Sequence, residues 1–165
     1  MTRIILVLVV LISSQLTFAN ENSKMTPETL FESIQNYTKS AKIENDVISF
    51  KYNQVNLYCV WDSTADRMRI ITPIANTSDL SVELLELALR ANYHTVLDAR
   101  YAIGDDILYA AFIHPLSSIT KKELESAIRQ VTTSALTFGT SFSSGELVFP
   151  GESEETKNDA ESSDI

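Results

Sequence analysis

The stretch from Leu80 to Gly139 constrains the fold of this chain most, because its helix and strand signals are the clearest. Ser81 can cap an apolar helix that runs to about Tyr93. Two runs rich in β-branched and aromatic residues follow, Thr95 to Ile103 and Ile107 to His114. Gly104-Asp105-Asp106 separates them as a tight turn, in which we expect the glycine to take a positive φ. The second run is apolar on both faces, which predicts an internal strand.

The last predicted helix has a start signal at its N-terminal end and a stop signal at its C-terminal end. Thr120 and Glu123 form a capping box, with Ile119 and Leu124 as a hydrophobic staple around it. Gly139 is a typical residue to end a helix. One apolar stripe is expected to face the core, formed by Leu124, Ala127, Ile128, Val131, Ala135 and Phe138.

The preceding part of the chain predicts one helix and three strands. The helix should begin at Thr26-Pro27-Glu28 and fade near Ser40, since Thr is a good cap and Pro suits the first helical position. The period then changes to two. The predicted strands are Val47 to Tyr52, Val55 to Asp62 and Arg67 to Ile74.

The expected element order is therefore α-β-β-β-α-β-β-α. Short links between the strands predict an antiparallel sheet of about five strands with the helices packed on it, which is the α+β class. Glu146 to Phe149 could add a small docked strand.

The helix of residues 81–93 carries more apolar surface than one buried face needs. Either the sheet and the other helices cover it, or part of it meets another protein chain. In the second interpretation, the exposed contact surface would use Leu85, Leu89 and Tyr93.

The two ends of the chain are expected to lie outside the folded domain. Residues 1–19 have a basic start, an apolar run and a small residue at Ala19, which predicts a cleaved signal peptide and a periplasmic or secreted protein. An uncleaved membrane anchor is the alternative, although the apolar run is short for a span. Residues 20–150 should form one domain. Residues 151–165 are acidic and have almost nothing to bury, which predicts a disordered tail.

Charge narrows the classes of partner. The formal net charge is −9, and the basic residues are scattered. Nucleic acid and anionic membrane surfaces both require a clustered basic face. We therefore expect no nucleic acid, and no membrane span after signal cleavage, so that a protein partner, including a second copy of the chain, is the remaining expectation.

No residue pattern predicts catalysis, a cofactor or a metal site. Cys59 is the sole cysteine, and its place in an apolar strand predicts a buried thiol. His94 and His114 lack metal-ligand spacing. Asp62 and Asp66 lack the spacing of a calcium loop and are expected to be solvated turn residues. The SxxK spacing from Ser118 to Lys121 is explained by helix capping.

The whole pattern resembles the bacterial YbjN-like sensory-regulator family, whose domain is similar to the type III secretion chaperone fold. The resemblance covers about residues 26–138. It is carried by the run from Leu84 to Arg90 and Asn92, the strand near Tyr101, the acidic Asp105-Asp106 turn and the capped helix after Ile119. It implies protein binding, often dimerisation, and no catalytic residues.

Three hypotheses for function follow. The first is an exported, non-enzymatic protein-binding module, regulator or chaperone-like, for which a homodimer is one expected form. The second is a periplasmic small-ligand carrier or inhibitor, in which a sheet covered by helices holds an apolar molecule. The third, less favoured, is an enzyme with an unrecognised site.

Overall fold

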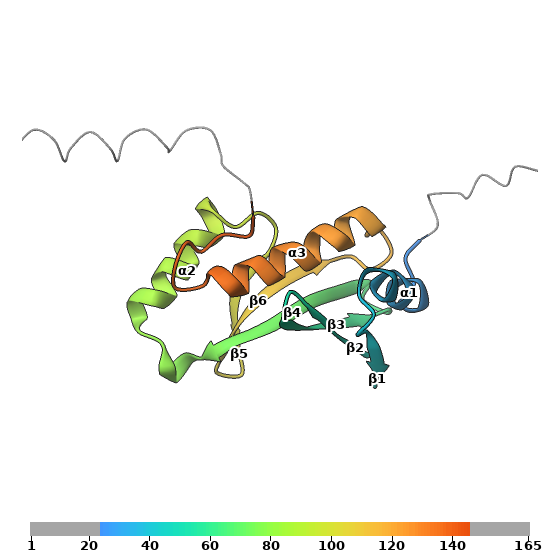
Figure 1. The fold of residues 1–165 in the computed structure, drawn as a ribbon, viewed down its shortest axis with the longest axis horizontal. Helices are drawn as coiled ribbons and strands as arrows, with labels where there is room; N and C mark the ends of the chain where they lie inside the picture. Colours follow the sequence, from blue (N-terminus) through green and yellow to red (C-terminus); the bar gives the residue numbers. More distant parts are fainter. Residues whose placement is uncertain (1–23, 146–165) are drawn as a thin grey trace, which may run out of the picture.

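The computed structural model describes residues 24–145 of the chain. Within that range the chain forms three α-helices and one six-stranded antiparallel sheet (Figure 1). The helices are α1 (Pro27–Tyr37), α2 (Val82–His94) and α3 (Lys121–Thr137). The strands are β1 (Lys42–Glu44), β2 (Val47–Tyr52), β3 (Val55–Asp62), β4 (Arg67–Asn76), β5 (Arg100–Gly104) and β6 (Ile107–His114). A single 3₁₀ turn, η1 (Thr77–Asp79), links β4 to α2.

The spatial order of the strands is β1-β2-β3-β4-β6-β5, so β1 and β5 are the edge strands. The α+β class, the antiparallel sheet and the internal position of β6 are confirmed. The expected count of about five strands was low, because the element order is α-β-β-β-β-α-β-β-α. The missed strand, β1, has only three residues, all exposed, and no apolar period marks it. Its pairing with β2 through a two-residue turn holds it in place.

The strand predicted to begin at Thr95 begins instead at Arg100. Side chains from distant parts of the chain take the backbone N–H groups before it. Leu97 N donates to Ser144 Oγ at 2.7 Å, and Asp98 N and Ala99 N donate to Gln130 Oε1 at 2.8 and 3.0 Å. Because side chains already occupy these three backbone N–H groups, they do not pair with a neighbouring strand, and β5 does not extend back toward Thr95.

Helices α1 and α3 pack on one face of the sheet, and α2 lies at its edge beside β5. On this face the strands contribute buried side chains that pair across the ladder, such as Cys59 with Ile70 and Ile70 with Phe112. Leu30 and Ile34 of α1 and Ile128 and Val131 of α3 are fully buried against them. The alternate residues of the same strands point to the opposite face, which no helix of the described chain covers (Figure 1). The sheet is therefore one-sided.

Three hairpins turn through pairs of residues in the left-handed region. The pairs are Asn45-Asp46, Asn53-Gln54 and Asp105-Asp106. The expectation that Gly104 would supply the positive φ was wrong. Gly104 is the last residue of β5, and Asp105 and Asp106 take φ values of 47° and 61°. Asn and Asp tolerate this region because their short side chains bond locally.

Gln54 is the turn residue that suits this backbone least, with φ of 69°. We expect Gln54→Gly to raise the free energy of unfolding by about 0.5–1 kcal/mol, because glycine adopts a positive φ without steric cost. Urea denaturation of both proteins would measure the difference. Gln54→Ala, which keeps a Cβ, should give no gain. An equal gain from both variants would contradict the backbone explanation.

The predicted helix starts are confirmed. Thr26, Ser81 and Thr120 each accept a hydrogen bond from the third helical residue of their helix. Glu123 completes the capping box of α3 by accepting from Thr120 N at 2.7 Å. This bond is the main reason that the pKa of Glu123 lies below its ordinary value.

Asp66 is more than a solvated turn residue, unlike Asp62, which caps its own turn. Asp66 Oδ1 accepts from Ser117 N at 2.7 Å and Asp66 Oδ2 from Ser117 Oγ at 2.8 Å. Met25 N in turn donates to Ser117 O at 3.1 Å. Asp66 thus ties the β3–β4 turn to the segments that precede α3 and α1. The partner is 51 residues away, so no local pattern indicates it.

These bonds make stability depend on pH. The backbone and hydroxyl of Ser117 lower the pKa of Asp66 from its ordinary 3.8. The pKa of Asp66 is lower in the folded than in the unfolded chain. The stability that ionised Asp66 contributes is therefore complete above pH 3.8, and it is lost as the pH falls through the folded-state pKa. We expect Asp66→Asn to have a lower urea midpoint than the unsubstituted chain at pH 7. At strongly acidic pH the two midpoints should become equal. Ser117→Ala should reduce the same pH dependence. A difference that stays constant with pH would contradict the prediction.

Candidate protein-binding surfaces

The outer face of α2 carries an exposed apolar stripe, here called the α2 stripe. Its members are Val82, Leu89 and Tyr93, which are 81%, 67% and 82% exposed. Their spacing of seven and four residues places them on one side of the helix. Ala88 and Ala91 lie on the buried side. Exposure of this extent on one helix face is typical of a surface that meets another protein.

The three contact residues predicted from the sequence do not share one environment. Leu89 and Tyr93 lie in the α2 stripe, whereas Leu85 is half-buried and packs against the core. Val82 was not predicted because it begins the helix, where sequence patterns define the face poorly. Glu86 and Arg90, an ion pair at 2.9 Å, lie alongside the stripe and supply a polar rim.

Asn92 fixes the orientation of the stripe. Its side chain donates to Tyr101 O at 3.1 Å and accepts from Tyr101 N at 2.8 Å. Tyr101 pairs with Ala110 at a position of the β5–β6 ladder where its own N–H and C=O point away from β6. The amide of Asn92 therefore takes the place of a further strand at this edge. Bound in this way, α2 lies beside β5 with its stripe facing solvent.

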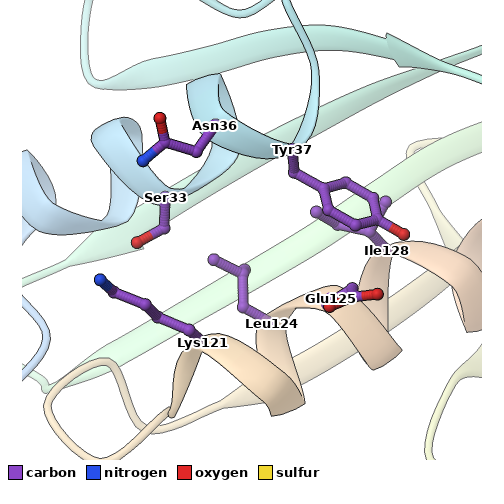
Figure 2. Close-up of a pocket in the computed structure, with 7 residues that line it drawn as sticks. All are labelled: Ser33, Asn36, Tyr37, Lys121, Leu124, Glu125 and Ile128. Atoms are coloured by element: carbon purple, nitrogen blue, oxygen red, sulfur yellow. The ribbon is translucent and has the colours of Figure 1, made fainter. Parts of the chain in front are cut away.

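A second candidate surface is the groove between α1 and α3 (Figure 2). Its volume is about 210 Å³. The buried side chains of Leu124 and Ile128 form an apolar floor. The polar rim consists of Ser33, Asn36, Tyr37, Lys121 and Glu125. An apolar floor with a polar rim fits a side chain of a bound peptide, since the rim can satisfy the peptide backbone.

Tyr37 closes one end of this groove. Its ring lies 5.2 Å from that of Tyr52, and its hydroxyl donates to the Tyr52 hydroxyl at 3.2 Å. Burial, and then this hydrogen bond, raise the pKa of Tyr37. The phenol is therefore neutral at physiological pH and acts as a hydrogen-bonding wall of the groove, with no role as a base.

A second hollow, of about 330 Å³, lies beside the start of β5 and is lined by charges of both signs. Asp98 and Glu123 contribute carboxylates, and Arg100 and His114 contribute basic groups. The side chain of Arg100 is bound to Leu97 O and Ala99 O. Ligand sites usually measure about 300–1,000 Å³. Since both hollows lie at or below the lower end of that range, the small-ligand carrier stays a prediction.

The structure gives the surroundings of two of the residues considered for chemistry, Cys59 and His114. Cys59 is buried in β3, as predicted, and burial raises the pKa of its thiol to about 12, so it is not a thiolate nucleophile at neutral pH. His114 bonds Pro115 O through Nδ1 and stacks on Phe112. Within residues 24–145 no group of three or more His, Cys, Asp or Glu side chains could hold a metal ion. None of the helices in that range could span a bilayer.

Comparison with known proteins shows which fold this chain has, but it does not show a family or a function. No family model matches the chain, and no curated protein matches it. Solved structures do match. The Yersinia pestis type III secretion chaperone SycH, in complex with a stable fragment of YscM2, has a TM-score of 0.54 at 14% identity, over 68% of this chain and 99% of that one.

Two further structures agree. The HopA1–SchA chaperone–effector complex gives a TM-score of 0.53 at 12% identity, over 67% of this chain and 91% of the other. The ExsC–ExsE complex gives 0.51 at 12% identity, over 64% and 85%. The chain therefore has a fold like that of type III secretion chaperones, as the resemblance implied. Membership of the YbjN-like family stays a prediction.

Proposed function

We propose that this chain is an exported, non-enzymatic protein-binding module of the chaperone-like or regulatory kind, which acts as a homodimer. The α2 stripe carries the proposal. The helix exposes a valine, a leucine and a tyrosine in one line. Contact with a second protein would remove this apolar surface from water, which is energetically favourable.

The fold comparison supports the protein-binding part. SycH and SchA are chaperones seen in complex with other proteins. The α1–α3 groove, with its apolar floor of Leu124 and Ile128, is the surface that we assign to the partner peptide. The thiol of Cys59 is protonated and buried, which supports a role without nucleophilic chemistry.

Export is the part of the proposal that rests on the sequence alone, through residues 1–19. Fractionation of the native host, with mass spectrometry of the recovered N-terminus, tests it. We expect a chain that begins at Asn20 in the periplasm or medium. Recovery of a chain that still begins at Met1 from the cytoplasm would overturn it.

Substitution of Leu89 by Arg tests the homodimer. A twofold-symmetric contact would use the α2 stripe of both copies, so one substitution introduces two charges into the interface. We expect sedimentation equilibrium of the mature chain to show a dimer, and Leu89→Arg to weaken it by at least about 100-fold, equivalent to about 2.7 kcal/mol.

Leu136→Arg is the matched control for this experiment. Leu136 is 60% exposed, close to the 67% of Leu89, but it lies on α3. The control should leave the dimer unchanged. A mature chain that sediments as a monomer at high concentration, or a dimer that Leu89→Arg leaves intact, would overturn the proposed dimer.

A further inference from the structure

The face of the sheet that the helices leave uncovered, here called the open face, has an apolar centre. Residues that pair directly across the ladders form continuous rows on it. One row crosses every strand and consists of Lys42, Ser49, Tyr58, Ile71, Ala111 and Arg100. The centre of this row is apolar. The adjoining row carries the apolar Val60 and Ile113 on either side of Arg69, which pairs with both of them.

These central side chains are not used by the core. Tyr58 is 37% exposed and Ile113 is 57% exposed, while Val60 and Ile71 are half-buried. None of the four belongs to the core cluster or packs against it. A patch of this kind in the middle of a sheet usually has something to cover it.

The open face is also basic, although the chain as a whole has a net charge of −9. Strand alternation places four basic side chains and two acidic ones on it, apart from Arg100, whose side chain is bound to Leu97 O and Ala99 O. The basic ones are Lys42, Lys51, Arg67 and Arg69, and the acidic ones are Glu44 and Asp62. The basic groups lie around the apolar residues and, at Arg69, between them, so the face suits a segment that is both acidic and partly apolar.

Residues 146–165, which follow the described chain, have this composition. They include seven acidic residues and one lysine, and the apolar run Leu147-Val148-Phe149 follows Glu146 at their start. The segment thus combines an apolar part with an acidic part, as the open face combines an apolar centre with a basic surround. Opposite charges on the two would favour their contact at moderate salt.

The chain reaches its last described residue at the edge of the sheet. Ser144 N donates to Thr95 O at 3.4 Å, and Leu97 N donates to Ser144 Oγ at 2.7 Å. Leu97 lies three residues before β5, the edge strand. From there the span across β6 and β4 to β3 is about 15 Å, at about 4.8 Å a strand. Twenty residues reach about 65 Å when extended. The segment is long enough to pass round β5 and cross the face.

We propose that residues 146–165 of the same chain cover the open face, with Leu147-Val148-Phe149 against its apolar centre and the following carboxylates among the basic side chains. The cover shields a sheet surface that would otherwise be free to associate with other proteins. It uses neither the α2 stripe nor the α1–α3 groove, so it does not depend on the homodimer.

A spin label in the segment tests this proposal. Ser153→Cys provides the attachment site in the full mature chain, and the buried Cys59, with its raised thiol pKa, should remain unlabelled. We expect the nitroxide to remove most of the NMR amide signal of Tyr58, Ile71 and Ala111. Amides of α1 and α3 lie behind the sheet, farther from the label, and should lose less signal. Salt at 1 M, where the screening length is about 3 Å, should restore much of the lost signal.

Charge reversal on the open face provides the control. Lys51→Glu with Arg69→Glu should restore the signal, whereas reversal of the exposed helix arginines, Arg90→Glu with Arg129→Glu, should not. Unlabelled ¹⁵N chains mixed with labelled ¹⁴N chains should show no loss; a loss there would mean that another copy supplies the segment, and would overturn the intramolecular cover. No loss in the labelled chain itself would also overturn it. Leu89→Arg should leave the result unchanged, which separates this proposal from the homodimer.

Discussion

Replacement of Ile70 by Ala is expected to lower the free energy of unfolding by about 3 kcal/mol, because the substitution leaves a cavity in a close-packed core. Ile70 has no exposed surface and pairs with Cys59 on one side and Phe112 on the other. For a domain of this size the melting temperature should fall by roughly 10 °C. Urea denaturation and calorimetry of the mature chain would measure both quantities.

Ile71→Ala is the matched control, since Ile71 is the next residue of the same strand and has the same side chain. It points to the open face and is half-buried. We expect a loss of about 1–2 kcal/mol, smaller than that of Ile70→Ala even with residues 146–165 against the open face, because no close-packed core surrounds this side chain. Equal losses for the two substitutions would contradict the description of a sheet with helices on one face only.

Gln130→Leu is expected to lower the free energy of unfolding by about 3 kcal/mol, the cost of leaving two backbone donors without partners. Gln130 is 5% exposed, and its Oε1 accepts from both Asp98 N and Ala99 N. Its Nε2 donates to Asp98 Oδ2 at 3.3 Å and to Ser126 Oγ at 3.1 Å. Leucine fills a similar volume and forms none of these bonds.

Arg129→Ala is the control for this prediction. Arg129 adjoins Gln130 in α3 and forms an exposed pair with Glu125 at 3.1 Å, which is worth at most about 0.5 kcal/mol. Hydrogen exchange should show faster exchange of the Asp98 and Ala99 amides in Gln130→Leu and unchanged exchange in Arg129→Ala. A small loss of stability from Gln130→Leu would mean that water satisfies these amides.

Local sequence signals were sufficient to predict an element where the residues that stabilise it lie close together in the sequence. The capping box of Thr120 and Glu123 closes within three residues, and the buried stripe of α3 repeats within two turns. Both follow from the residues alone. The alternation of buried and exposed side chains in β2, β3 and β4 is equally local, and the change to a period of two predicted these three strands.

The candidate surfaces were predicted less completely. The apolar excess of residues 81–93 indicated a contact helix and correctly gave Leu89 and Tyr93 as exposed. The same apolar excess led to the wrong prediction that Leu85 is exposed. Helical spacing shows which residues share a side of the helix, but it does not show how far the core extends around the helix. The groove between α1 and α3 had no signal, since its two sides are separated by more than 80 residues.

The sequence by itself determined the three helices of the described chain, five of its six strands and their order, because those properties depend on neighbours within a few bonds or turns. Tertiary structure alone decided where β5 begins, how Asn92 closes its edge and which partner Asp66 binds. Each of these depends on a hydrogen bond between residues that the chain separates by 9 to 51 positions. Such a bond forms only after packing has brought its two ends together, so no local pattern of residues can encode it.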